Sequence, residues 1–443
     1  AVLPSSTIYA FNGTFPGPMI NTEYGQPVLV RFENDLDMNP LGLDRQDFGD
    51  PALKFLTHLH NAHTAPESDG NPYYMQQNGG GYLPGQWSDN LYLNYPAGGD
   101  PNEKQSFFWY HDHVMHHTGE NVYKGLVGIY PIYDPDLDPG DELDDGVNGN
   151  ALHLPGIKTV NEDGTFDVKY DIPLVFYDVA LDDGVTLHDD MHTLPQNIDT
   201  HPEWWGKSFY QHNVDTGLVG DIFTVNGTAF PVLEVYQRQY RFRFLDASVA
   251  RIYEMTLMTS DAGPVAMPGT QGQWQIPDGE LWQPFTQIAT MGGLLPEPQL
   301  RDSIQVWPAG RSEHIVDFSN VPAGTVIYLT NILEMPDGRK PEFNDPEDHV
   351  NLAPYKVPMV KIIVGGPPPE GEEGPSSVPS QLRPLPVIPP QVVLDTLPQP
   401  EFIVDRSGNL GFENQWQIND KAFDPLVTLH TVIRGQPEVW TFT

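Results

Sequence analysis

An all-β fold is predicted by three features of the 443-residue sequence: its composition, the alternation of its apolar segments and a motif that occurs three times. The chain contains 45 Pro and 41 Gly, and 11% of its residues are aromatic. This composition is typical of many short strands joined by turns. We therefore expect few helices, one of them a short helix within His116–Lys124.

The repeated motif consists of a short strand, an Asn turn, an aromatic residue and a second strand. Its three copies are centred on Asn12, Asn226 and Asn419. A period of two is that of β structure, and three copies in the same order predict three related β domains. In the second strands, alternate apolar residues share one face: Val28, Val30 and Phe32 in the first copy, and Tyr240, Phe242 and Phe244 in the second.

The copies begin about 200 residues apart, which is the size of a β-sandwich with additional loops. Residues 366–400 are rich in Pro, Gly and Glu and predict an extended linker. An acidic stretch, Asp134–Gly156, marks an earlier boundary. The third copy stops at Thr443 within its second strand, so we expect the third domain to be incomplete in this chain. The predicted domains are residues 1–150, 151–365 and 401–443.

Acidic side chains outnumber basic ones by 60 to 22, which gives a formal net charge of −38. Such a surface repels phosphate backbones, so nucleic-acid binding is not expected. Two interpretations of the charge stay open: it keeps the protein soluble, for instance in a salty medium, or it steers a cationic substrate.

Cysteine is absent, which excludes disulfides, zinc–thiolate sites and thiol catalysis within this chain. No segment is apolar enough to span a bilayer. The N-terminal residues 1–4 contain neither a basic nor an apolar region, so we expect a mature secreted, extracellular or cell-surface chain whose signal peptide has been removed. Asn12-Gly-Thr and Asn226-Gly-Thr match the glycosylation pattern, but Asn-Gly is the strongest short turn signal, and we favour turns at both.

Two His-x-His pairs are the candidate functional residues. His58-Leu59-His60 and His111-Asp112-His113 each follow an apolar segment. Residues i and i+2 of a strand point to the same face, so each pair can direct two imidazoles at one point. Four imidazoles suit copper, zinc or nickel, and copper where the chemistry is redox, because zinc has no accessible redox step. A single pair would more often be exposed or hydrogen-bonded, but two pairs in one domain favour a metal site.

Other residues beside the pairs have less defined roles. His63, His116 and His117 lie off the alternation, so we expect them at the surface or behind the ligands. Asp112 points away from the ligand face of a regular strand. It is either a solvated acid or a carboxylate that holds a ligand ring or accepts protons.

Several segments resemble the spore-coat laccase and bilirubin oxidase branch of the multicopper oxidases. The resemblance runs from Thr7 to the C-terminus and is thin in the linker. It implies three cupredoxin-like domains (Greek-key β-sandwiches), which agrees with the repeat. The segments are Phe108-Trp-Tyr-His-Asp-His-Val-Met115, Asn121-Val-Tyr-Lys-Gly-Leu-Val-Gly128, Phe15-Pro-Gly-Pro18, His58-Leu-His60 with Ser68-Asp-Gly70, and Tyr240-Arg-Phe-Arg-Phe-Leu-Asp-Ala247.

By this resemblance the pairs belong to a copper cluster that reduces dioxygen to water. It implies that His58 is a ligand of the type 2 copper, and that His60, His111 and His113 are ligands of the type 3 pair. Asp112 matches an acid behind the cluster and is our candidate catalytic residue.

The sequence departs from the family pattern in two places. The family usually has Gly after the first pair, where this chain has Asn61; Asn can adopt a left-handed turn, so we expect it to be tolerated. The motifs His-Pro-x-His-x-His and His-Cys-His, which supply the remaining cluster ligands and the type 1 copper, are absent.

Three functions stay open, and we favour the first. It is a laccase-like oxidase that couples one-electron oxidation of a phenol, aromatic amine, tetrapyrrole or metal ion to the reduction of dioxygen to water. A companion C-terminal polypeptide would supply the missing motifs. The second is a non-catalytic copper-binding or scaffold protein with half of a site. The third is an acidic surface protein whose pairs bind zinc.

Overall fold

The computed structural model describes two compact units, Ala1–Pro384 and Leu385–Thr443. The predicted boundary near residue 150 lies outside the described residues, and the predicted division into domains stays a prediction. Val378 and Leu382, inside the predicted linker, pack on the first unit. The described residues are 3–36, 53–73, 80–135, 152–189, 198–210, 217–266, 274–335, 337–338, 355–384, 388–406, 416–422, 424 and 426–443.

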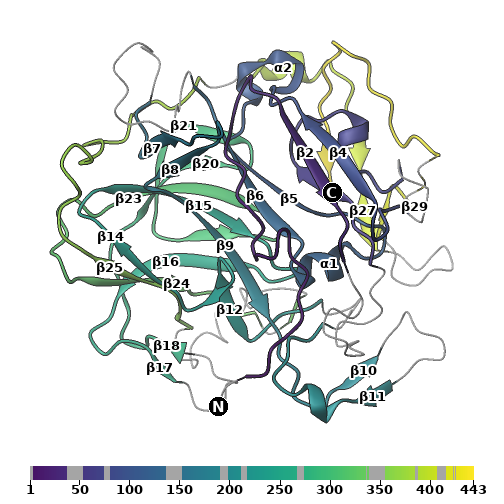
Figure 1. Ribbon diagram of the computed structural model, residues 1–443. Coiled ribbons are helices and arrows are strands. Elements are labelled where there is room, and N and C mark those ends of the chain that lie inside the picture. The colour runs from purple at the N-terminus through teal and green to yellow at the C-terminus, as the bar shows by residue number, and fades with distance from the viewer. Residues whose placement is uncertain are drawn as a thin grey trace. The chain divides into compact units, whose positions relative to one another are not determined.

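The first part of the larger unit is a small β-sandwich (Figure 1). Aromatic residues from both of its sheets, among them Phe32, Tyr92, Phe108 and Tyr130, form one core. In the first strand of the smaller sheet, apolar residues alternate with exposed ones as predicted. One sheet has the order β1 (Thr22–Glu23), β6 (Val127–Tyr133), β5 (Phe107–Asp112) and β3 (Thr57–His60), and the other pairs β2 (Val28–Glu33) with β4 (Trp87–Tyr92).

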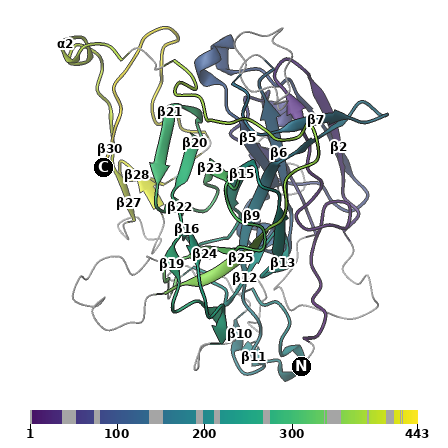
Figure 2. The ribbon, with the colours of Figure 1, turned by 90° about the vertical axis from the view of Figure 1, so that its left-hand side faces the viewer.

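A larger β-sandwich follows along the chain (Figure 2). Its core includes the predicted inward residues Tyr240, Phe242 and Phe244. One sheet has the order β13 (Thr228–Ala229), β12 (Ile222–Val225), β9 (Asp171–Val179), β15 (Gln239–Asp246), β23 (Arg311–Asp317), β20 (Phe285–Thr290) and β21 (Gly293–Arg301). The other has the order β14 (Val232–Val235), β25 (Val357–Val364), β24 (Val326–Asn331), β16 (Tyr253–Thr259) and β19 (Glu280–Leu281), with β22 (Ile304–Val306) also paired to β16.

The remaining elements are short, and the all-β prediction is confirmed. The predicted helix near the second histidine pair is α1 (Thr118–Lys124). No helix among the described residues is long and apolar enough to cross a membrane. The other elements are β7 (Ile157–Val160), β8 (Phe166–Lys169), β10 (Leu187–Asp189), β11 (Ile198–Thr200), β17 (Val265–Ala266) and β18 (Trp274–Gln275), and, in the second unit, α2 (Gln391–Leu394), β26 (Glu401–Phe402), β27 (Val404–Arg406), β28 (Trp416–Ile418), β29 (Lys421–Ala422) and β30 (Thr441–Phe442).

The two sandwiches share a buried contact that contains charges. Arg241 and Arg243 alternate with the core residues of β15 and are nevertheless fully buried. Arg243 pairs with Asp171 at 2.6 Å and donates to the carbonyl oxygen of Ser106 in the first sandwich at 2.6 Å, while Arg241 pairs with Glu313 at 2.5 Å. Buried charges are retained in proteins when they are paired in this way. With the hydrogen bond from the Ser106 hydroxyl to Glu313, the contact fixes β15 and β23 of the second sandwich against the residue that precedes β5 of the first.

The repeated Asn performs the same structural role in the second and third copies. The Oδ1 of Asn226 accepts from the Val175 amide at 2.8 Å, and its Nδ2 donates to the Pro173 carbonyl at 3.0 Å. Asn419 bonds the Ile403 amide and the Glu401 carbonyl at 2.7 and 3.0 Å. The side chain thus joins its turn to β9 in the second copy and to the segment of β26 and β27 in the third.

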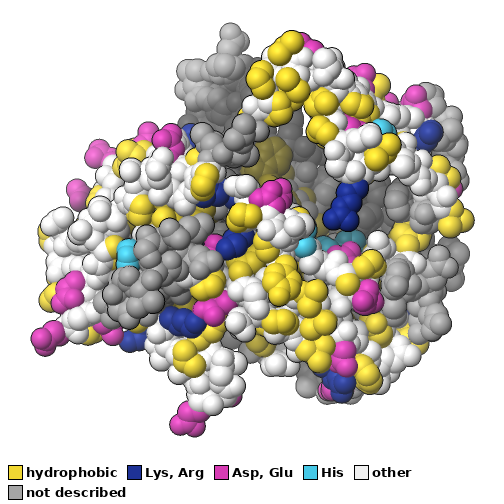
Figure 3. Space-filling view, turned by 90° about the horizontal axis from the view of Figure 1, so that it is seen from above, with side chains coloured by type: hydrophobic (Ala, Val, Ile, Leu, Met, Phe, Trp, Pro, Cys, Tyr) yellow, Lys and Arg dark blue, Asp and Glu magenta, His cyan; other side chains and the backbone are white. Residues whose placement is uncertain are grey.

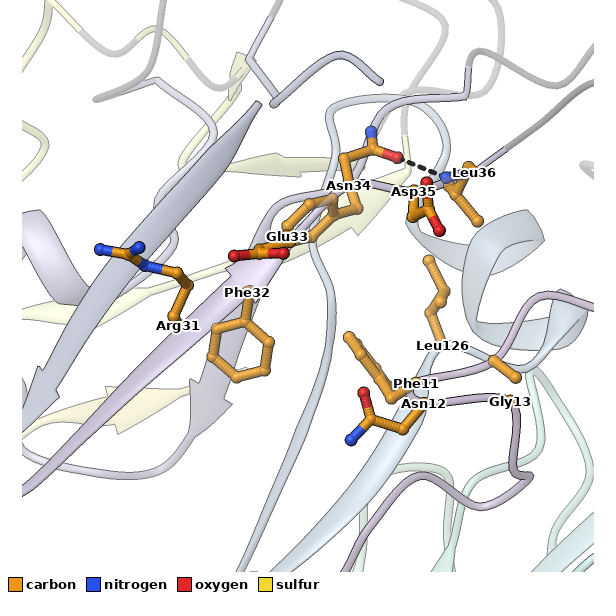
Figure 4. Close-up of a pocket in the computed structure, with 12 residues that line it drawn as sticks. Phe11, Asn12, Gly13, Arg31, Phe32, Glu33, Asn34, Asp35, Leu36 and Leu126 are labelled. Atoms are coloured by element: carbon orange, nitrogen blue, oxygen red, sulfur yellow. Dashed lines mark hydrogen bonds between the residues drawn. The ribbon is translucent and has the colours of Figure 1, made fainter. Parts of the chain in front are cut away.

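The first copy differs from the other two. Asn12 and Asn226 both lie in turns, as predicted, with φ of 50° and 51°. However, the predicted strand before Asn12 is wrong, since this segment forms only an isolated bridge between Phe11 and Thr14. No described strand forms a ladder with it, although the Phe11 ring packs on Phe32 of β2 and Tyr110 of β5. The Asn12 side chain lines a pocket of about 560 Å³ next to Phe32 (Figure 4).

Replacing Asn226 by Ala should destabilise the protein, because two backbone groups lose their partners. Asn12→Ala is the matched control. Both positions have positive φ, so the cost of placing Ala instead of Asn in that conformation is the same at both. We expect Asn226→Ala to cost about 1–2 kcal/mol more than Asn12→Ala in the free energy of unfolding, measured by urea denaturation. Equal losses would contradict the assigned role.

Candidate metal centre

Neighbouring strands bring the two histidine pairs together. β3 and β5 are antiparallel, and His58 lies directly opposite His111. His113 follows the end of β5, where its backbone amide donates to the Leu56 carbonyl at 2.7 Å. The predicted arrangement of the pairs on adjacent strands is therefore present.

Four imidazole rings gather at this place. Ligand nitrogens of His58, His60 and His111 all lie within 4.8 Å of one another. The Nδ1 of His60 is 3.2 Å from the Nε2 of His111. The ring of His113 lies 5.2 Å from that of His58 and 5.7 Å from that of His111, between centroids. All four residues nominated from the sequence thus belong to one cluster.

Backbone carbonyl groups orient two of the rings. The Nδ1 of His58 lies 2.5 Å from the Asp69 carbonyl oxygen, and the Nδ1 of His111 lies 2.6 Å from that of Asp112. A hydrogen bond at one ring nitrogen leaves the other available to a metal. Gly70 follows with φ +74°, and a Cβ there would lie 2.2 Å from the Thr57 carbonyl oxygen. Only glycine therefore lets this loop approach β3 closely enough to hold His58.

Trp109 packs beside the cluster, a role that the sequence did not indicate. Its ring stacks on His111 at 4.1 Å and on His60 at 5.2 Å between centroids. In the β3–β5 register it lies opposite His60. The apolar ring restrains two candidate ligands and helps to exclude water.

Burial keeps three of the candidate ligands, His60, His111 and His113, in the neutral form that binds metals. It lowers the pKa of His60 to about 3, with a further contribution from the nearby Arg311 cation. Burial also lowers the pKa of His111 and of His113 below the usual value. At neutral pH these rings offer lone pairs without having to lose protons.

Asp112 lies behind the cluster and is fully buried, so the interpretation as a solvated acid is wrong. Its Oδ1 accepts from the Leu56 amide at 3.0 Å, and its Oδ2 accepts from the Val114 amide at 3.0 Å and the Asn121 side chain at 3.1 Å. Burial raises its pKa to about 7. The carboxylate thereby ties the segment before β3 and helix α1 to the end of β5.

The other histidines near the pairs lie outside the cluster, as expected. His63 and His116 are exposed. His117 is partly buried and lies 3.4 Å from Glu120. Asn61 adopts the expected left-handed conformation, with φ of 69°.

The chemistry of these donors fits a bound copper ion. Neutral imidazole is a suitable copper ligand, and this cluster offers several such nitrogens at short mutual distances. In addition, the Nδ1 of His113 is buried and has no hydrogen-bond partner among the described residues. A buried nitrogen without a partner is costly unless something binds it, which a metal would do.

Replacing Asp112 by Asn should destabilise the metal-free protein by about 1–3 kcal/mol, because an amide cannot accept from all three donors. The pKa of Asp112 is about 7 when folded and 3.8 ordinarily, so its stabilising contribution is complete below pH 3.8 and is lost as the pH rises through 7. The difference in urea midpoint between wild type and Asp112→Asn should therefore be larger near pH 4.5 than near pH 8. With exposed Asp167→Asn as the control, a difference that grows toward pH 8 would contradict this assignment.

Known proteins resemble this chain in sequence. No family model matches it. The laccase of Bacillus subtilis (strain 168) is 29% identical over 362 residues, which cover 80% of this chain and 58% of the relative. The bilirubin oxidase of Albifimbria verrucaria is 28% identical over 331 residues, or 74% of this chain and 42% of the relative. The chain thus spans about half the length of these relatives.

Solved structures resemble it in fold. The laccase of Pediococcus acidilactici has a TM-score of 0.60 and 22% identity, covering 97% of this chain and 66% of its own. The laccase-like oxidase of Ochrobactrum sp. has a TM-score of 0.62 and 18% identity, covering 98% and 74%. Together with the strands described above, these neighbours confirm the cupredoxin-like fold. In sequence and in fold, the chain is thus similar to multicopper oxidases.

Proposed function

We propose that this chain forms the larger part of a laccase-like oxidase that reduces dioxygen to water. The observation that supports it most is the cluster of four histidines on and beside β3 and β5, three of which have lowered pKa values. We assign His58 to a type 2 copper, and His60, His111 and His113 to a type 3 pair.

Bound copper would supply one-electron redox steps, so that four single electrons from a reductant can reach one dioxygen molecule with four protons to give two waters. The chain itself presents unprotonated imidazoles in fixed orientations. Trp109 covers the rings of His60 and His111. Asp112 stabilises the backbone behind them and, with a pKa of about 7, can hold or release a proton near neutral pH.

We further propose that a C-terminal segment completes the site. Four histidines are too few for the cluster plus a type 1 copper, and the chain has no Cys to bind the latter. The second unit also exposes many apolar side chains for its size, which favours a covering partner. These side chains include Ile388, Val392, Leu426, Val427, Val432, Ile433, Trp440 and Phe442.

The alternative is a copper-binding or scaffold protein without turnover. It requires only a half-site made of the four clustered histidines. The two functions differ in whether a polypeptide with the missing motifs accompanies this chain. We favour the oxidase because the relatives that match most of this chain include a laccase and a bilirubin oxidase.

The reducing substrate is proposed only as a class: a phenol, aromatic amine, tetrapyrrole or metal ion. On the face drawn in Figure 3, acidic side chains are scattered in separate places and form no single patch. This distribution favours solubility over steering of a cationic substrate as the role of the negative charge. We also propose that the protein acts outside the cytoplasm.

Intact-mass and peptide analysis of the natural protein, with its copper content, tests the oxidase directly. We expect a polypeptide that contains His-Pro-x-His-x-His and His-Cys-His, several coppers per assembly and dioxygen uptake with a phenol. A preparation of this chain alone, without blue colour or dioxygen uptake, would favour the scaffold.

His113→Ala in the assembled oxidase should abolish dioxygen reduction while the blue colour is retained. Residues behind metal ligands already contribute 10–100-fold, so losing a ligand should reduce dioxygen uptake by more than about 100-fold. Exposed His63→Ala is the control and should have wild-type uptake. Unchanged uptake in His113→Ala would remove it from the ligands.

A further inference from the structure

A buried arginine from the second sandwich reaches the turn that follows His60. Arg311 begins β23 and is only 3% exposed. Its Nε donates to the Phe107 carbonyl at 3.1 Å, its Nη1 to the Ala309 carbonyl at 2.6 Å, and its Nη2 to the Asn61 Oδ1 at 2.6 Å. All three acceptors are neutral, and no carboxylate in the described part of the chain pairs with this cation.

A cation in this setting is expensive. Removing a charge from water without a counter-ion costs several kcal/mol or more, whereas Arg241 and Arg243 nearby are compensated by Asp171 and Glu313. The position of Arg311 is therefore not explained by the contact between the sandwiches alone. Its acceptors indicate what it does.

Two of these acceptors lie where the β3–β5 ladder stops. The last register pair joins His60 to Trp109. Asn61 then turns away with φ of 69°, so its backbone cannot continue the ladder. Arg311 bonds both the Asn61 side chain, just after β3, and the Phe107 carbonyl, at the start of β5. The planar guanidinium bridges the open end of the pair, which a single point charge would do less well.

We propose that Arg311 and Asn61 act together as a clamp that positions His60, and with it the gap between His60 and His111, for metal binding. This inference rests on the proposed function in taking His60 and His111 as ligands. Neither clamp residue touches the metal, so both are positioning residues. The family usually has Gly where this chain has Asn61, and Gly has no side-chain acceptor, so the clamp distinguishes this chain from that pattern.

Asn61→Gly tests the clamp without endangering the fold, because Gly accepts positive φ readily. The metal-free chain would be titrated with Cu²⁺ against a competing chelator, and the bound ion examined by electron paramagnetic resonance. We expect an affinity on the order of tenfold weaker and a changed spectrum, since a hydrogen bond from a charged group is lost. Asn61→Asp retains an oxygen acceptor and should keep the wild-type spectrum.

Arg311→Lys is the second variant, because it keeps the positive charge but lacks the planar guanidinium group that bonds both Asn61 and Phe107. If the two residues act as one device, the double variant Asn61→Gly/Arg311→Lys should bind Cu²⁺ about as weakly as either single variant. The matched control is Asn12→Gly, a turn residue with φ of 50° outside the centre, which should leave affinity and spectrum unchanged.

The outcomes separate the clamp from the metal centre. Wild-type affinity and spectrum in Asn61→Gly would overturn the clamp and leave the metal centre intact. A lower melting temperature with an unchanged spectrum would also overturn it, by showing a structural role alone. If His60→Ala and His111→Ala bind Cu²⁺ as wild type does, the proposed metal centre itself fails.

Discussion

The pairing of β3 with β5 is the constraint on which the candidate centre depends. The antiparallel register places His58 opposite His111, and the pleat turns each pair toward one side. A shift by one residue would send every one of these rings to the other face. Several contacts hold the register: Asp112 bonds the amide before β3, Gly70 lets a loop hold His58, and Arg311 bridges the far end.

The second sandwich helps to hold the pairing of β3 with β5. β23 is fixed by buried ion pairs and also contains Arg311, so one strand both joins the sandwiches and contacts the histidine turn. Metal affinity in this chain should therefore depend on residues far along the sequence. A first domain alone would have all four histidines but would lack one side of the clamp.

Much of the fold and of the candidate site could be predicted from the sequence, because these parts follow from local sequence patterns. Alternation identified the strands, Asn-Gly identified the turns, and i, i+2 spacing placed each histidine pair on one face. The predictions failed where long-range contacts decide. The segment before Asn12 has the repeat sequence, but no described strand pairs with it, so it forms only a bridge. Arg241 and Arg243 look like exposed residues of an alternating strand, yet partners more than 60 residues away bury them.

The same reason explains the missed site residues. Trp109 was only an apolar residue in a strand until the register placed its ring against two histidines. The sequence correctly predicted that Asp112 points away from the ligand face. Its burial could not be predicted, because it depends on helix α1 and the segment before β3. Nothing near Arg311 in the sequence points to Asn61, which is 250 positions away.

The central claim is that these histidines bind copper together, and X-ray absorption at the copper edge of the copper-loaded chain tests it most directly. We expect nitrogen neighbours of copper at about 2.0 Å, a distance typical of imidazole bound to such ions, with the multiple scattering of several imidazole rings. This scattering should decrease when His111 is replaced. A coordination shell of oxygen atoms alone, unaffected by that replacement, would contradict it.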